Sequence, residues 1–193
     1  RAPARIADIG ITGSRTERIG DLSGATGACE IDATGKIVSP GVIDPHTHYD
    51  APIHWDPYVT SSSWHGTTTI VMGNCGFGYA PCRPDHRDRY MWMMVNTEQI
   101  PYESQKLALD WSWETFPEWL EHLRSIPKGV NVGMFLPLNP LLVYVKGDEV
   151  KSRPTSDAER ERMKELLNEA MDAGALGFSL SLLGNGNGHV DYD

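Results

Sequence analysis

The sequence predicts an α/β protein that contains the first half of a (β/α)8 TIM-type barrel, preceded by part of a small β-sandwich. Three observations predict this fold. Residues 5–38 contain short segments in which apolar and polar residues alternate, separated by turn residues. Continuous apolar segments follow in the rest of the chain. Amphipathic helical segments lie between those apolar segments. Strands that alternate with helices are typical of a parallel sheet. We therefore expect two domains, the sandwich part at 1–39 and the barrel part at 40–193.

The first domain is expected to consist of short strands. Residues 5–12 alternate apolar and polar side chains, as a half-buried strand does. Residues 33–36 are a candidate hairpin turn that leads into Ile37 and Val38. The Ser-Pro-Gly sequence at 39–41 ends this pattern, so the domain boundary is expected there.

The second domain should hold parallel strands. Four apolar segments are expected to form them, at 42–46, 67–72, 131–136 and 175–181. A complete eight-stranded barrel takes about 250 residues, so four strands form about half of one. We therefore expect the chain to be part of a larger protein, or to pair with a separate polypeptide that supplies the other half.

Two segments between these strands have clear helical signals. Residues 116–124 place apolar side chains at the spacing of one helix face. Residues 157–173 form the best helix, since Ser156 and Glu159 have the spacing of a capping box. Gly174 stands where a helix commonly ends in a left-handed residue.

Composition excludes some classes of partner. The formal net charge of −9 argues against nucleic acid, because an acidic surface repels phosphates. No apolar run reaches the about 18 residues that a membrane span needs, and the N-terminal residues lack the apolar core of a signal peptide. Three scattered cysteines, at 29, 75 and 82, are too few for a disulfide framework and indicate reduced thiols in a cytoplasmic protein.

His46 and His48 are the clearest candidates for metal ligands. Residues two apart on a strand point to the same side, so two imidazoles can reach one ion. They stand at the carboxyl end of the strand expected at 42–46, where barrel enzymes build their sites. Two exposed histidines in a loop would give the same pattern, and the preceding apolar strand favours the metal hypothesis.

Cys75 is the second candidate. It follows the strand expected at 67–72, and glycines at 73 and 76 allow the backbone to turn tightly around it. A thiolate is a strong zinc ligand, and a nearby dication deprotonates a thiol. The alternative is an inert buried cysteine.

Taken together, these residues resemble the N-acyl-D-amino-acid deacylases (D-aminoacylases) of the amidohydrolase superfamily. The resemblance covers essentially the whole chain, and its two specific motifs are PGVIDPHTH at 40–48 and GTTTIVMGNCG at 66–76. The segments at 113–120 and 173–179 support it. The resemblance implies a metal-dependent amidohydrolase barrel flanked by a β-sandwich.

The resemblance also implies the chemistry. His46, His48 and Cys75 would bind zinc, as one or two ions, with Cys75 bridging them if both are present. The metal would polarise the carbonyl of a small-molecule amide and supply a hydroxide nucleophile. The aspartate that moves protons and two further histidines are expected beyond Asp193, so no catalytic residue is expected in this chain. Activity then requires the remaining part of the same enzyme.

Some features leave the substrate open. Segment 136–142 departs from the family, in which many members have a histidine there, and His189 is expected in a substrate loop. An N-acyl-D-amino acid is the expected substrate, with a cyclic amide or imide as the alternative. The alternative from another functional class is that the chain is a catalytically incomplete fragment with a structural or oligomerisation role. The protein could also form a homo-oligomer.

Other residues near the motifs have weaker signals. Asp44 could fix the tautomer of a ligand, but a structural hydrogen bond is an equal alternative. Trp55 and Trp64 could line an acyl pocket. His86 lies in a charged run and is expected at a solvated helix start.

Overall fold

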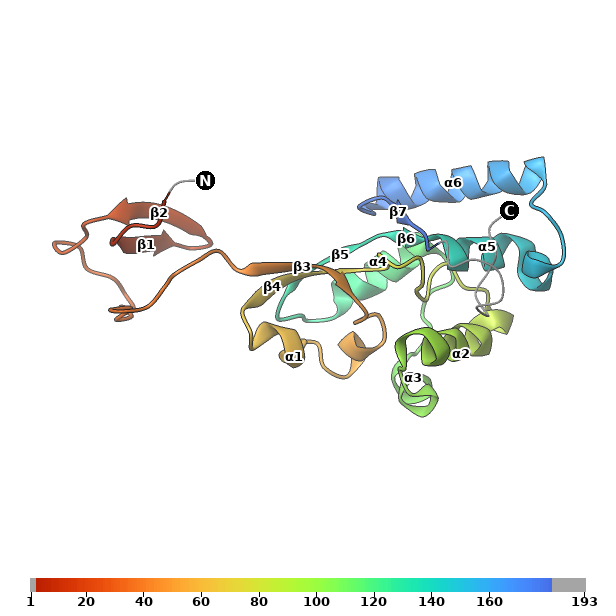
Figure 1. Ribbon diagram of the computed structural model, residues 1–193, viewed down its shortest axis with the longest axis horizontal. Coiled ribbons are helices and arrows are strands. Elements are labelled where there is room, and N and C mark those ends of the chain that lie inside the picture. The colour runs from red at the N-terminus through yellow and green to blue at the C-terminus, as the bar shows by residue number, and fades with distance from the viewer. Residues whose placement is uncertain (1–2, 182–193) are drawn as a thin grey trace. The chain divides into compact units, whose positions relative to one another are not determined.

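The computed structural model describes residues 3–181, and the chain divides into two compact units, Arg1–Pro40 and Gly41–Asp193 (Figure 1). His189, expected in a substrate loop, lies outside the described residues.

The first unit contains a two-stranded antiparallel hairpin. Strands β1 (Asp8–Thr12) and β2 (Arg15–Gly20) pair through a turn in which Gly13 has a φ of 59°. The turn predicted at 33–36 forms, since the Lys36 amide donates to the Ala33 carbonyl, but no strand follows it at Ile37 and Val38. No described residue of this unit is buried. The sandwich therefore stays a prediction.

The second unit is built on parallel strands, as predicted. Strands β3 (Val42–Thr47), β4 (Thr67–Met72) and β5 (Asn131–Met134) form a sheet in that order. Strand β6 (Leu136–Pro137) pairs in parallel with β7 (Phe178–Ser179). Backbone hydrogen bonds from Leu176 to Met134 and from Leu136 to Gly177 link the two pairings. The strands thus lie side by side in chain order.

The strand predicted at 131–136 is divided in two. Phe135 separates β5 from β6, and its amide donates to the Met72 carbonyl. The strand predicted at 175–181 is shorter than expected, with only Phe178–Ser179 paired as a strand. These irregularities occur beside the carboxyl end of β4, next to the candidate site.

Helices occupy the connections between the strands, as Figure 1 shows. Their bounds are η1 Pro52–His54, α1 Thr60–Ser63, η2 Pro84–His86, α2 Arg87–Glu98, α3 Tyr102–Ala108, α4 Phe116–Ser125, α5 Leu138–Lys146, η3 Gly147–Lys151 and α6 Asp157–Ala173. No helix in the described part of the chain is both long and apolar enough to cross a membrane.

The predicted helix signals are confirmed at α6. The Ser156 hydroxyl accepts from the Glu159 amide, and the Glu159 carboxylate accepts from the Ser156 amide at 2.8 Å. Gly174 ends the helix in the left-handed region, with a φ of 110°. Helix α4 begins with a second capping box, formed by Thr115 and Glu118.

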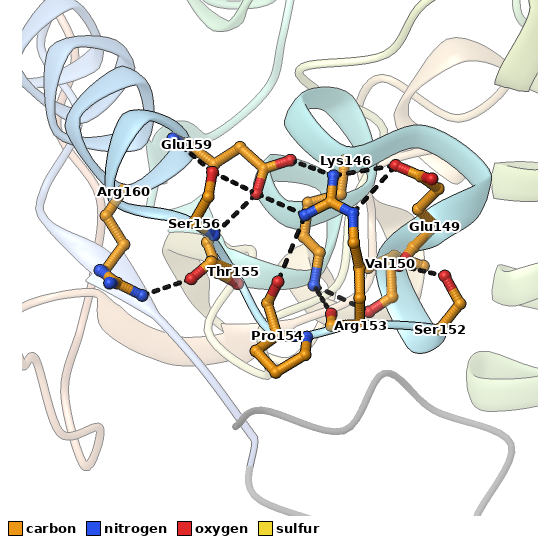
Figure 2. A network of polar contacts seen from close by, with 10 residues as sticks. All are labelled: Lys146, Glu149, Val150, Ser152, Arg153, Pro154, Thr155, Ser156, Glu159 and Arg160. Atoms are coloured by element: carbon orange, nitrogen blue, oxygen red, sulfur yellow. Dashed lines mark hydrogen bonds and ion pairs between the residues drawn. The ribbon is translucent and has the colours of Figure 1, made fainter.

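An ion-pair network joins α5 to α6 (Figure 2). The Arg153 guanidinium lies 2.9 Å from Glu149 and 2.6 Å from Glu159, so one cation bridges η3 and the first turn of α6. The buried Lys146 ammonium donates to the carbonyls of Val150 and Arg153, at 3.2 and 2.6 Å. These contacts fix the position at which α6 begins.

The core of the second unit is rich in aromatic side chains. Trp113, Trp119, Tyr79 and Tyr90 are among its largest fully buried residues, and they belong to one hydrophobic cluster with Ile70 and Met72 of β4. His86, expected in a solvated helix start, is instead 8% exposed. Its ring packs near Gly147, at the start of η3, which explains the difference.

Candidate metal centre

His46 and His48 lie at the end of β3, and their rings stand together. The ring centroids are 5.2 Å apart. Thr47 between them is buried and its hydroxyl donates to the Val71 carbonyl at 2.9 Å, which holds the end of β3 against β4. Because Thr47 points into the structure, the two histidines project together on the other side.

Cys75 reaches the histidines through a tight turn after β4. Gly73 has a φ of 74°, and a Cβ there would stand 2.6 Å from the Phe135 carbonyl oxygen. Gly76 has a φ of 85°, and a Cβ there would stand 2.9 Å from the Leu180 Cα. Only glycine fits such a close approach in this backbone conformation. The Asn74 side chain donates to the Pro45 carbonyl at 2.8 Å and ties the turn to β3.

The structure brings His46, His48 and Cys75 together. One ligand atom from each lies within 4.8 Å of the other two, and Cys75 Sγ is 3.9 Å from His48 Nδ1. Sulfur and nitrogen ligands of one tetrahedral zinc ion lie about 3.5 Å apart, given zinc distances of about 2.3 and 2.0–2.1 Å. The three side chains therefore have the spacing and the donor types that suit zinc.

Glu98 also faces this cluster, a contact that was not predicted from the sequence. Its Oε2 lies 3.2 Å from His48 Nε2, and its Oε1 lies 3.8 Å from Cys75 Sγ. Glu98 is the last residue of α2, where the negative end of the helix dipole disfavours a carboxylate. A carboxylate at a helix C-terminus is the one local signal that could have identified it.

Asp50 adds a buried carboxyl group nearby. It is 1% exposed, and neither of its oxygens has a hydrogen-bond partner among the described residues. Burial, together with the nearby Glu98 carboxylate, raises the pKa of Asp50 to about 7. An orphaned carboxyl group in an acidic surrounding is a setting that favours a cation.

The protonation of the cluster depends on such a cation. Burial, together with the carboxylates of Glu98 and Asp50, raises the pKa of the Cys75 thiol to about 12. Burial lowers the pKa of His48, which favours the neutral imidazole that metal ions bind. A dication would reverse the effect on Cys75, since a coordinating thiol is deprotonated. The donor set and its electrostatics thus fit zinc.

The other predicted residues have different positions. The Asp44 carboxylate accepts a hydrogen bond from the His46 backbone amide at 3.2 Å. This bond corresponds to the structural role that was one of the two alternatives for Asp44. Trp55 and Trp64 are 47% and 83% exposed. Segment 136–142 forms β6 and the start of α5, and the Asn139 amide donates to the Gly76 carbonyl, next to Cys75.

Sequence comparisons identify the family of this chain. The profile of the Amidohydrolase family matches residues 30–186. The N-acyl-D-aspartate deacylase of Alcaligenes xylosoxydans xylosoxydans is 36% identical over 92% of this chain and 33% of its own length. The D-aminoacylase of the same organism is 33% identical over 92% of this chain and 34% of its own length. The chain spans about a third of the length of these relatives.

Solved structures show the same relationship. A crystal structure of D-aminoacylase matches 97% of this chain and 37% of the D-aminoacylase chain, with a TM-score of 0.77 and 31% sequence identity. The N-acyl-D-glutamate deacylase of Bordetella bronchiseptica, solved with zinc and a phosphonate inhibitor, has a TM-score of 0.77 and 29% identity over 94% of this chain and 35% of its own. From the matched profile and these relatives, the chain belongs to the amidohydrolase family.

Proposed function

We propose that this chain carries part of the active site of a zinc-dependent hydrolase of amide bonds, and that His46, His48 and Cys75 are metal ligands. One observation carries the proposal: the ligand atoms of these three side chains lie within 4.8 Å of one another, although they come from the ends of two neighbouring strands. Three relatives that match 92–94% of this chain are deacylases, and one of them was solved with zinc.

Each side chain has a defined part in this proposal. His46 and His48 offer neutral imidazole nitrogens, and Cys75 offers a thiolate held by the glycine-flanked turn. When bound, zinc polarises the amide carbonyl and activates water at neutral pH. Thr47 fixes the orientation of both imidazoles through its bond to Val71.

The substrate that we propose is an N-acyl-D-amino acid. The support comes from the relatives, which are an N-acyl-D-aspartate deacylase, a D-aminoacylase and an N-acyl-D-glutamate deacylase. We further propose that the described strands form one wall of a (β/α) barrel. Other parts of the protein would then supply the proton-transferring aspartate and further metal ligands. This agrees with the chain spanning about a third of the length of its relatives.

Zinc content and activity of a cysteine variant test this proposal. Cys75→Ala in the intact protein should lose most of the bound zinc and most of the hydrolysis of N-acetyl-D-amino acids. Cys29→Ala is the matched control, because Cys29 is an exposed free thiol in the first unit. Zinc content and activity that stay unchanged in Cys75→Ala would overturn the ligand assignment.

A further inference from the structure

A surface pocket lies where the beginning of α2 meets the end of α3. Its volume is about 310 Å³, at the lower end of the range of about 300–1,000 Å³ that small-molecule sites occupy. Helix α2 has 12 residues and is therefore about 18 Å long, at a rise of about 1.5 Å per residue. Arg87, its first residue, lines the pocket, and Glu98, its last, faces the candidate metal centre. The pocket is thus at the opposite end of α2 from that centre.

Four charged side chains of both signs line this pocket. They are Asp85, Arg87, Asp88 and Lys106. Carboxylates and cations gathered around one pocket commonly form ion pairs, yet none of these four forms one with another described residue. All four charges are therefore available to a ligand.

Aromatic rings hold the two cations in place. The Lys106 ammonium lies 5.7 Å from the centroid of the Tyr102 ring, whose hydroxyl donates to the Asp88 carboxylate at 2.8 Å. The Arg87 guanidinium lies 5.6 Å from the centroid of the Trp111 ring. A ring attracts a cation at such a distance through its quadrupole. These rings explain why the cations stay in position without an acidic partner.

The Arg87 guanidinium is oriented by a hydrogen bond as well. Its Nη2 donates to the Trp111 carbonyl at 3.0 Å. Its Nη1 has no hydrogen-bond partner in the described part of the chain. A guanidinium that is fixed on one side and free on the other is well suited to bind a carboxylate.

The pocket also has an apolar part. Met91, Leu109 and Trp111 line it, and all three side chains are buried within the protein except where they border the pocket or its rim. An apolar ligand group that covers them removes further apolar surface from water, which favours binding.

A ligand of a single charge would meet repulsion in this pocket, because each sign is represented twice. A zwitterion meets an opposite charge at both of its ends. We propose that the pocket binds a free amino acid with an apolar side chain. Its carboxylate lies against Arg87 and Lys106, and its ammonium lies against Asp85 and Asp88. Its side chain covers the apolar part of the pocket.

Isothermal titration calorimetry of the intact protein tests the charges of the ligand. Leucine should bind, and two analogues that each lack one charge should bind at least about tenfold more weakly. These analogues are 4-methylpentanoate, which lacks the ammonium, and 3-methylbutylamine, which lacks the carboxylate. Hydrogen bonds to charged groups contribute enough for a ratio of that size. Absence of leucine binding, or equal binding of either analogue, would overturn the proposal.

Variants locate the binding site. Lys106→Gln should weaken leucine binding at least about tenfold, and it is a cleaner test than a change at Arg87, whose bond to the Trp111 carbonyl also supports the fold. Lys36→Gln, at an exposed lysine of the first unit, is the control and should bind leucine as the parent does. Parent-like leucine affinity in Lys106→Gln would overturn the proposal.

Cys75→Ala separates this inference from the proposed function. It should bind leucine with the affinity of the parent, because the pocket and the Cys75 turn lie at opposite ends of α2. Loss of leucine binding in Cys75→Ala would place the amino acid at the metal centre and overturn the inference. Zinc that is retained in Cys75→Ala overturns the proposed function and leaves the pocket unaffected.

Discussion

The Nε2 atoms of His54 and His122 lie 2.9 Å apart, in a pair of stacked imidazoles between η1 and α4. His54 Nδ1 faces the Ala51 carbonyl at 3.0 Å, so that nitrogen carries the proton and Nε2 of His54 accepts. His122 then donates through Nε2, and its Nδ1 accepts from the Ser112 hydroxyl at 2.8 Å. The chain of bonds thus assigns one neutral tautomer to each ring.

This pair predicts a loss of stability on mild acidification. Burial lowers the pKa of His54 and of His122, so the unfolded chain binds protons that the folded pair resists. The stabilisation is then fully present above the unfolded pKa of about 6.5 and is lost as the pH falls through the lower folded values. Denaturant unfolding at pH 7.5 and at lower pH should show this decrease.

A variant of the pair should reduce that dependence on pH. His122→Gln removes one titrating ring, so the difference in unfolding free energy between pH 7.5 and 5.5 should shrink. His65→Gln is the control, because His65 is exposed and should leave the difference as it is. An equal shrinkage in both variants would contradict the assignment to the half-buried pair of His54 and His122.

The capping box of α6 predicts a second effect on stability. Ser156→Ala removes the acceptor for the Glu159 amide and should cost about 1 kcal/mol, within the range of about 0.5–2 measured for such caps. Asp172→Ala, at an exposed position near the end of the same helix, should change stability by less than about 0.5 kcal/mol. Equal urea midpoints for Ser156→Ala and the parent would count against the cap.

The turn before Cys75 predicts a difference between two glycines. Gly66 and Gly73 both have positive φ, at 91° and 74°, but a Cβ would meet nothing within 4 Å at Gly66 and the Phe135 carbonyl oxygen at Gly73. Gly66→Ala should cost about 1–2 kcal/mol from the left-handed backbone alone. Gly73→Ala should cost more, because it adds the clash, and should also weaken zinc binding by displacing Cys75.

Comparison of the two alanine variants tests the turn. The free energy of unfolding and the zinc affinity should both be lower in Gly73→Ala than in Gly66→Ala when the two variants are measured side by side. Parent-like zinc affinity in Gly73→Ala would show that the position of Cys75 does not depend on this turn.

Local signals in the sequence predicted much of the second unit. The capping box at Ser156 and Gly174 depends on residues that are adjacent along the chain, and the helix formed as expected. The pairing of His46 with His48 follows from the alternation of side chains along a strand. The approach of Cys75 was expected because parallel strands place their carboxyl ends at one edge.

Features that depend on long-range packing were not predicted. Glu98 meets His48 because α2 ends beside β3, and the local signal of a carboxylate at a helix C-terminus does not identify that partner. His86 stands in a charged run, yet η3 covers its ring. At the break, the Phe135 amide donates to the Met72 carbonyl on the neighbouring strand, a contact that no local pattern encodes.

X-ray absorption spectroscopy of the zinc-loaded intact protein tests the central claim most directly. The account predicts a zinc–sulfur distance of about 2.3 Å together with nitrogen ligands at about 2.0–2.1 Å, and loss of the sulfur signal in Cys75→Ser. A spectrum without sulfur in the parent, or one that keeps its sulfur in Cys75→Ser, would contradict the assignment of His46, His48 and Cys75 as ligands.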